Sequence, residues 1–485
     1  MPKKPFIYQR RRPEENLLYQ TVAAHLNTFL AELAEEGKSL PKHVEQELWS
    51  YLRCGVLAYG FLRLKCEGCK AEQFVAFSCK KRGFCPSCGA KRMTETAHHL
   101  VDNILPNAKV RQYVLSVPVP LRYWMASNNK LLAKIHRIFA SEIEKHYLKK
   151  HSHRSRSGSI CFVQRFGSAL NLNVHFHMLQ LEGIYELKET GYTKFKKSAP
   201  PTDHDIKVLV ATISQRVIRQ LKRLRYLNDT DTDRAPGDSL LEEEPTYASC
   251  MSASLRHLIA LGERRGQRVR FLGKGFGYEE DLPELRGRLC AQVNGFSLHA
   301  GVAIPRHRRD QLIRLIGYVG RSSVCLDRLS LTPTGDIKYQ LKKPWKNGVT
   351  HVVLSPTELI EKLCSLVPLP YLNLVRYWGV FAPNSKYRAS VIPGLTRAQI
   401  KEKETQENNK DPKETPNLLK KSSWAKLLAK VFQMDISKCR SCGEDMKFIS
   451  SIEDPMVIKK ILTHCGLAPI PPPIAPARYQ QRLVS

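Results

Sequence analysis

Two histidines in an apolar segment are the residues of this chain best suited to binding a metal ion. They are His175 and His177, within the run LNLNVHFHMLQL at 170–181. If this run is a β-strand, alternate side chains point to opposite faces, so both imidazoles share one face and an apolar row from Leu170 to Met178 fills the other. Neutral imidazole is the commonest protein metal ligand. The alternative is a pair of hydrogen-bonded structural histidines, which a motif this short does not exclude.

A second segment, SICFVQRF at 159–166, is also typical of a strand. The short turn at Gly167 and Ser168 predicts that it pairs antiparallel with the histidine strand. Gln164 would then lie beside His175, where its amide oxygen is a candidate third metal ligand. A glutamine on an ordinary sheet surface is the alternative.

A candidate nucleophile lies in the run RHRRDQLIRLIGYVGR at 306–321, whose apolar residues recur at helical spacing. Tyr318 is on the polar side of this predicted helix, with Arg314 one turn before it and Arg321 one turn after it. A positive field favours the phenolate and neutralises a phosphate, which suits attack by tyrosine on a phosphodiester. The alternative is a tyrosine on the surface of an amphipathic helix.

Closely spaced cysteines near the N-terminus predict a structural zinc site. Two Cys-x2-Cys pairs, with fifteen residues between them, match a four-cysteine site formed by Cys66, Cys69, Cys85 and Cys88. Cys79 and Cys54 are spare thiols or alternative ligands. A second zinc site could form in the tail from Cys439, Cys442 and His464, although their spacing is loose.

Basic residues surround the N-terminal cysteine pairs and are candidate contacts to phosphates. A solvated basic rim is the alternative interpretation. The residues are Lys80, Lys81, Arg82, Lys91 and Arg92.

The composition points to a polyanionic partner. Among 485 residues there are 77 Lys and Arg against 45 Asp and Glu, a formal net charge of +32, which favours nucleic acid. A basic ribosomal or membrane-surface protein is the alternative. Fourteen cysteines without a secretory signal indicate metal-bound thiolates more than disulfides. No run approaches the ~18 apolar residues of a membrane span, so we expect a cytoplasmic protein without a membrane partner.

The elements that must position these residues predict an α+β protein. We expect a helical region and zinc-binding domain at 1–100 and a main domain at 101–396, with an acidic loop at 228–245. A linker at 397–423 and a small C-terminal segment at 424–485, which carries the second Cys-x2-Cys pair, would follow.

The order of motifs resembles a known family. The zinc knuckles, VRQYVLSVP, QRFGSALNLNVHFH, GFSLHA and IGYVGR follow one another as in rolling-circle insertion-sequence transposases of the IS91-like and common-region type. These belong to the HUH superfamily of single-strand nucleases, named for histidine–hydrophobic–histidine. The resemblance implies that His175 and His177 bind the catalytic metal and that Tyr318 is the nucleophile. Ser322 occupies the position of a second tyrosine, so the chain resembles the single-tyrosine branch.

The resemblance also implies an activity. A nuclease domain with an antiparallel sheet flanked by helices would nick single-stranded DNA at the ends of the element and transfer it to target DNA through a 5′-phosphotyrosine, with Mn²⁺ or Mg²⁺ at the histidines and structural Zn²⁺ at the cysteines. A plasmid replication initiator or relaxase with the same chemistry stays open, as does a non-enzymatic zinc-dependent DNA-binding protein. Whether the chain works as a homodimer is also open.

Overall fold

The structure, a computed structural model, describes residues 12–149, 151, 154–187, 193–227, 237–273, 287–345, 347–394, 439 and 441–478. Its described residues combine helices with antiparallel sheets, as predicted for an α+β protein. No helix in these ranges is both long enough and apolar enough to cross a membrane.

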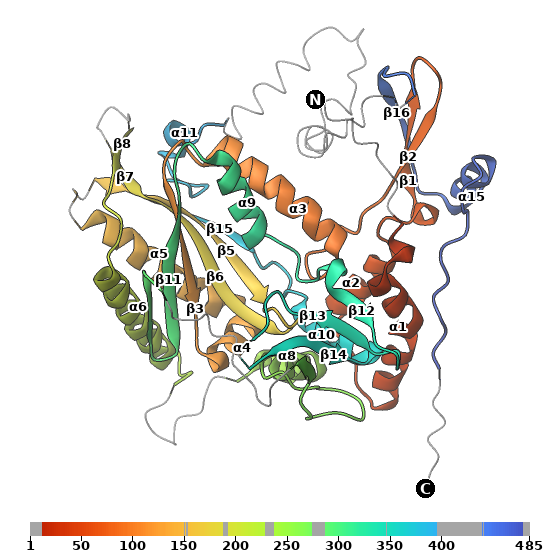
Figure 1. Cartoon of the computed structure of the whole chain (residues 1–485), viewed down its shortest axis with the longest axis horizontal. Helices are drawn as coiled ribbons and strands as arrows, with labels where there is room; N and C mark the ends of the chain where they lie inside the picture. Colours follow the sequence, from red (N-terminus) through yellow and green to blue (C-terminus); the bar gives the residue numbers. More distant parts are fainter. Residues whose placement is uncertain are drawn as a thin grey trace.

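A six-stranded antiparallel sheet forms the centre of the main domain (Figure 1). The strand order is β10-β11-β3-β6-β5-β15. Strand β6 therefore lies inside the sheet, and β5 pairs with it antiparallel as predicted, with Gln164 opposite His175. The strands are β3 (Val110–Ser116), β5 (Gly158–Phe166), β6 (Leu172–Leu181), β10 (Cys290–Val293), β11 (Phe296–Ile304) and β15 (Val375–Gly379).

Two layers of helices cover the two faces of this sheet. The apolar face of β6, including Val174, Phe176 and Met178, is buried in the larger hydrophobic core. Helices on that side are α4 (Val119–Ser127), α5 (Asn129–Leu148), α6 (Asp203–Arg223) and α8 (Pro245–Leu255). The face that carries the histidines is covered by α3 (Pro86–His99), η3 (Leu100–Ile104) and α9 (Arg309–Val319).

The predicted apolar stripe of α9 is confirmed. Leu312, Ile316 and Val319 are buried against Leu179 and Leu181 of the histidine strand. Because these residues recur at three- and four-residue steps, their burial sets the helix lengthwise over the sheet and leaves Tyr318 on its other side.

Smaller elements surround this sandwich. Helices α1 (Leu17–Glu35), α2 (Lys42–Arg53) and α10 (Pro356–Leu366) pack at one end, beside a sheet of order β12-β13-β14-β9. A further sheet has the order β4-β7-β8. The remaining elements of these parts are η1 (Pro13–Glu15), η2 (Leu57–Tyr59), β4 (Ser155–Arg156), β7 (Gly183–Leu187), β8 (Thr193–Lys197), β9 (Arg270–Gly273), η4 (Leu326–Arg328), β12 (Leu329–Leu331), β13 (Ile337–Gln340), β14 (Val349–Leu354) and α11 (Arg388–Val391).

The C-terminal tail joins the N-terminal module. Strand β16 (Met446–Ile452) pairs antiparallel with β1 (Phe61–Cys66), which pairs on its other side with β2 (Glu72–Ala76). In Figure 1 the blue tail strand lies beside the orange N-terminal hairpin. Helix α15 (Pro455–His464) then buries Ile458 and Leu462 against Leu57 and Phe61. The described part of the expected C-terminal segment is thus not a separate unit.

Two other segments expected from the sequence, the linker and the acidic loop, lie wholly or partly outside the described residues. The linker at 397–423 lies outside them, as does 228–236 of the predicted acidic loop. The rest of that loop contains a short helix, α7 (Ser239–Glu243), which the sequence interpretation missed. Asp238 caps this helix by accepting a hydrogen bond from the Leu241 amide.

Candidate metal centre and nucleophile

The two histidines of β6 are held with their rings side by side. Their ring centroids are 4.9 Å apart. Nδ1 of His175 lies 2.9 Å from the carbonyl oxygen of Asn173, to which it donates when protonated, and this leaves Nε2 as a metal-binding atom. Nε2 of His177 is buried and has no hydrogen-bond partner among the described residues. A buried polar atom without a partner is what a missing ligand would explain.

Gln112 of the neighbouring strand β3 orients the second ring. Its side-chain amide lies 2.9 Å from Nδ1 of His177. The two ends of an amide are exchanged by a half-turn of the side chain. With the amide oxygen toward the ring, Nδ1 donates a proton to it and Nε2 keeps its lone pair for a metal.

Both histidines are in the protonation state that binds a metal. Burial lowers the pKa of His175 to about 4. Burial, followed by the charges of His175 and Arg321, lowers the pKa of His177 well below its usual value. The rings are therefore neutral at physiological pH, and the residues present fit a divalent ion.

Tyr318 lies among cations at the end of α9. The guanidinium carbon of Arg321 is 4.7 Å from the centre of its ring, and Nζ of Lys342 is 4.1 Å from that centre. Burial raises the pKa of Tyr318, but Arg321, the hydrogen-bonded ammonium of Lys342 and Arg328 together bring the pKa below its ordinary value. With 41% of its surface exposed, the phenol is also open to a substrate.

The cations around Tyr318 are not all those expected from the sequence. Arg314 is 81% exposed, and its guanidinium lies 3.9 Å from the carboxylate of Asp310. Its charge is not among the main causes of the shift in the pKa of Tyr318. Lys342, the first residue of the basic run KKPWK at 342–346, takes that place.

Gln164 connects the histidine strand to the tyrosine helix. It is buried opposite His175, and its Nε2 donates to the carbonyl oxygen of Val319 at 3.3 Å. The structure thus gives Gln164 a contact with the residue after Tyr318. Its role as a third metal ligand stays a prediction.

The N-terminal cysteines do not form the single site predicted from their spacing. Cys85 and Cys88, at the start of α3, gather with Cys54 and Cys79, and the closest sulfur pairs in this group are 3.4 to 3.7 Å apart. The four ligand atoms lie within 4.8 Å of one another. The prediction that Cys66 and Cys69 complete this group is wrong.

Cys66 and Cys69 instead meet the two cysteines of the tail. The sulfur of Cys66 is 3.4 Å from that of Cys442, and the sulfur of Cys69 is 3.4 Å from that of Cys439. His464, expected as a tail ligand, belongs to neither group. The pairing of β1 with β16 brings these cysteines together, and local spacing cannot reveal a partner that far along the chain.

The first cysteine group, which contains Cys85 and Cys88, is connected by direct contacts to α9, the helix that carries Tyr318. Helix α3 starts at this group and packs along α9. After α9, the hydroxyl of Ser323 donates to the Gly83 carbonyl at 3.3 Å, and that of Ser322 donates to the Phe84 carbonyl at 3.5 Å. A Cβ on Gly89 would lie 2.6 Å from Cβ of Ser322. Because these contacts are close, the position of the N-terminal zinc-binding domain can determine the position of Tyr318.

A basic pocket opens between the N-terminal zinc-binding domain and the end of α9. Lys81, Arg82, Arg92 and Arg321 contribute cations to its lining, and Phe166 contributes a half-buried aromatic ring. Two of these cations also donate hydrogen bonds to backbone carbonyl groups. Arg92 donates to the Lys81 carbonyl at 2.9 Å, and Arg82 donates to that of Leu372 at 2.6 Å.

The other predicted phosphate contacts lie beside this pocket. Lys80 is exposed, and its carbonyl oxygen accepts a hydrogen bond from Arg92 at 3.1 Å. Lys91 lies 3.9 Å from the carboxylate of Glu95. Their contact with DNA stays a prediction.

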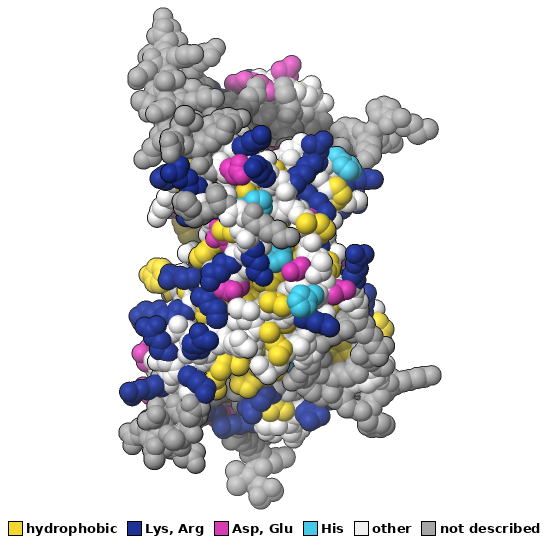
Figure 2. All heavy atoms as spheres, turned by 90° about the vertical axis from the view of Figure 1, so that its left-hand side faces the viewer, with side chains coloured by type: hydrophobic (Ala, Val, Ile, Leu, Met, Phe, Trp, Pro, Cys, Tyr) yellow, Lys and Arg dark blue, Asp and Glu magenta, His cyan; other side chains and the backbone are white. Residues whose placement is uncertain are grey.

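Positive charge also spreads over another surface. Figure 2 shows a face on which Lys and Arg side chains greatly outnumber acidic ones. This is the side of Figure 1 on which α6, β7 and β8 lie. Exposed cations of these elements are Lys194, Lys196, Lys197, Lys207, Arg219, Lys222 and Arg223.

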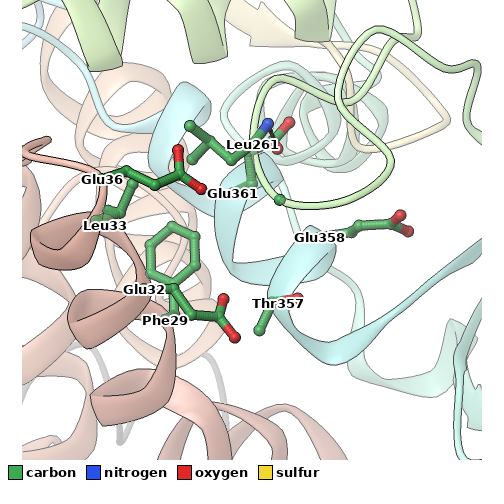
Figure 3. A pocket seen from close by; sticks show the side chains of 9 residues that line it. Phe29, Glu32, Leu33, Glu36, Leu261, Thr357, Glu358 and Glu361 are labelled. Carbon is green, nitrogen blue, oxygen red and sulfur yellow. Dashed lines mark hydrogen bonds between the residues drawn. The ribbon is translucent and has the colours of Figure 1, made fainter. Parts of the chain in front are cut away.

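A second pocket, between α1 and α10, has the opposite charge and a structural explanation. Figure 3 shows Glu32, Glu36, Glu358 and Glu361 around it. Glu361 accepts the backbone amides of Ala260 and Leu261, and Glu358 caps α10 and pairs with Arg264. Glu358 and Glu361 thus stabilise the fold at this pocket.

Comparison with known families found one match for the N-terminal part of the chain and one for the main domain. Residues 158–390 match the family described as "Putative transposase", and residues 22–117 match the family described as "Transposase zinc-binding domain", of the IS91 type. Searches of curated proteins and of solved structures found no significant match. The chain is therefore an IS91-like transposase with an N-terminal zinc-binding domain.

Proposed function

We propose that this transposase nicks single-stranded DNA with Tyr318 and carries out strand transfer through a 5′-phosphotyrosine intermediate. The observation that carries the proposal is the shared environment of three side chains. Arg321 lies over the ring of Tyr318, and its charge also acts on His175 and His177. One guanidinium thus acts on the phenol and on both imidazoles, and Gln164, opposite His175, contacts the residue after Tyr318.

In the proposed reaction the phenolate oxygen of Tyr318 attacks the scissile phosphorus. The bond from phosphorus to the 3′ oxygen breaks, and that oxygen leaves as a 3′-hydroxyl after taking a proton. Attack by a 3′-hydroxyl on the phosphotyrosine reverses the step and joins a new strand. The energy of the phosphodiester is kept in the covalent link, so no nucleotide cofactor is needed.

His175 and His177 would hold a divalent ion, Mn²⁺ or Mg²⁺. The chemistry that such an ion supplies is polarisation of the scissile phosphate. The positive charges of Arg321 and Lys342 stabilise the phenolate before attack and the phosphate charge during attack. The guanidinium of Arg321 can also bind phosphate oxygens through two N–H groups.

The basic pocket beside α9 is the proposed path of the strand that leaves or enters the site. Its cations suit phosphates, and the half-buried ring of Phe166, which also lines the pocket, offers a surface on which a base can stack. Single strands expose their bases for such stacking, whereas a duplex does not, which supports a single-stranded substrate.

The test is a covalent-adduct assay. Single-stranded oligonucleotides from the element ends, labelled on the 3′ side of the cleavage position, are incubated with protein and Mn²⁺ and run on a denaturing gel. We expect a labelled band at the mass of protein plus DNA that disappears on proteinase treatment. DNA binding without this band would identify a binding protein and contradict the proposal.

A further inference from the structure

The second cysteine group joins residues from the two ends of the chain. Cys66 ends β1 and Cys69 lies in the turn that follows it, whereas Cys439 and Cys442 lie in the turn before β16. The family match to the zinc-binding domain ends at residue 117, so it does not include the tail cysteines. The group therefore makes a site that the zinc-binding domain alone does not contain.

The sulfur distances suit a shared metal ion better than disulfides. The Cys66–Cys442 and Cys69–Cys439 sulfur pairs are each 3.4 Å apart. A disulfide would need about 2.05 Å. Four thiolates about 2.3 Å from one zinc ion in tetrahedral geometry lie roughly 3.8 Å apart. All four ligand atoms fall within 4.8 Å of one another, as a single ion requires.

The backbone around the tail cysteines is folded as a ligand turn. The amide of Ser441 donates to the sulfur of Cys439 at 3.4 Å, and the amide of Gly443 donates to the carbonyl of Cys439 at 3.0 Å. Gly443 has φ +78°, a left-handed conformation that glycine adopts without strain. Across the group, the Glu67 amide donates to the carbonyl of Asp445 at 3.1 Å. The two turns are thus fixed to each other as well as folded individually.

We propose that Cys66, Cys69, Cys439 and Cys442 bind a second structural zinc ion that fastens the C-terminal tail to the N-terminal module. The site is independent of the first group and of the DNA chemistry. Structural zinc contributes its binding free energy to folding, so the ion would stabilise the docked tail directly.

The contacts beyond the cysteines show what this ion would hold in place. Strand β16 completes the β1–β2 sheet, and α15 covers Leu57 and Phe61. Further along, Asn27 of α1 donates its side-chain amide to the Ala475 carbonyl at 2.7 Å, and the Arg478 amide donates to the hydroxyl of Thr28 at 3.0 Å. The tail thus spans from the cysteine site to α1.

The first test is the zinc content of the reduced full-length protein, measured by plasma mass spectrometry. We expect two zinc ions per chain in the unaltered protein and one in Cys439→Ser/Cys442→Ser. The matched control is Cys465→Ser, an exposed cysteine of the same tail outside both groups, which should keep two. Two ions in the double variant, or one ion in the unaltered protein, would overturn the proposal.

The second test separates metal binding from folding of the tail. A protease site is inserted within 397–423, the purified protein is cleaved, and the fragments are separated by gel filtration. The tail should stay bound with zinc present and separate after chelation or in Cys439→Ser/Cys442→Ser. Cys66→Ser/Cys69→Ser should release it too, while keeping the zinc of the other group. A tail that stays bound in both double variants would contradict the fastening role. Neither assay uses DNA, so the result does not depend on the proposed nicking activity.

Discussion

Gln164 lies opposite His175 in the central sheet and donates its side-chain amide to the carbonyl oxygen of Val319, the residue after Tyr318, at 3.3 Å. One buried side chain therefore connects the strand that carries the two histidines to the end of the helix that carries Tyr318, the proposed nucleophile. Such a tie matters because a misplacement of about 1 Å can cost about 100-fold in rate.

We expect Gln164→Ala to reduce adduct formation by about 10- to 100-fold without reducing DNA binding. Gln164→Glu separates the two roles of this residue. A carboxylate loses the donor to Val319 but is a good ligand, so it should restore activity only if Gln164 binds the metal. Single-turnover rates across a Mn²⁺ titration measure this, and an unchanged rate in Gln164→Ala would show that neither role matters.

Tyr318→Phe should bind DNA normally and form no adduct, a loss of roughly 1,000-fold or more, because the attacking oxygen is gone. Ser322→Ala should stay active, since Ser322 replaces a possible second tyrosine. Tyr371→Phe is the matched control, because Tyr371 is 96% exposed and is not among the tyrosine rings over which a described cation lies. Peptide mapping of the DNA-linked residue checks the assignment, and another tyrosine in that peptide would refute it.

His175→Ala/His177→Ala should abolish nicking and leave DNA binding, which the net charge of +32 mainly supplies. His299→Ala is the matched control, because His299 lies on β11, which is separated from the histidine strand β6 only by β3 in the same sheet. Since the pKa of His175 is lowered to about 4, the neutral ligand form should persist in the acid range where an ordinary histidine is already protonated. Nicking by the double variant at a normal rate would mean that these histidines are structural.

Adduct formation should rise with pH until Tyr318 is ionised and then level off. Because nearby cations outweigh burial and lower the pKa of Tyr318, levelling should come below the ordinary value of about 10. Lys342→Gln removes one of these cations, so it should move the curve to higher pH and slow the reaction several-fold at neutral pH. Lys343→Gln, at the adjacent exposed lysine, is the control. Superimposable rate profiles for both variants and the unaltered protein would exclude this role of Lys342.

Gly89→Ala should reduce adduct formation about 10-fold, because the new methyl group would lie 2.6 Å from Cβ of Ser322 and overpacking of this kind costs about 1–3 kcal/mol. Adding Ser322→Gly should restore part of the loss. Gly317→Ala places a methyl group on α9 itself at an ordinary 3.8 Å from Met93 and should be tolerated. Equal activity of the Gly89 and Gly317 variants would argue against coupling between the N-terminal zinc-binding domain and Tyr318.

Local periodicity was sufficient for the sheet and helix around the site. The two-residue period of β6 predicted which side chains share a face, although the structure buries nearly all of both faces, and the stripe of α9 predicted the burial of Leu312, Ile316 and Val319. Each pattern is formed by residues only two to four positions apart, so it can be recognised from the local sequence alone.

Long-range pairing accounts for what the sequence interpretation missed. Two Cys-x2-Cys pairs at a familiar spacing looked like one site, but Cys66 and Cys69 have partners from the tail because β16 pairs with β1. Arg314 and Lys342 exchanged roles for the same reason: helical spacing gives neighbours along α9, whereas the neighbours of Tyr318 across space come from the loop after β13.

The meeting of the two chain ends also has a consequence for synthesis. Cys69 and Cys439 are 370 residues apart, so at about 5–20 residues per second the ribosome makes the second pair roughly 20 to 75 s after the first. During that interval β1 has a free edge, and Cys66 and Cys69 are half of a site. Cys54, Cys79, Cys85 and Cys88, by contrast, are all made early. A prematurely terminated transposase would therefore carry one finished cysteine group and one incomplete group, which marks it as truncated.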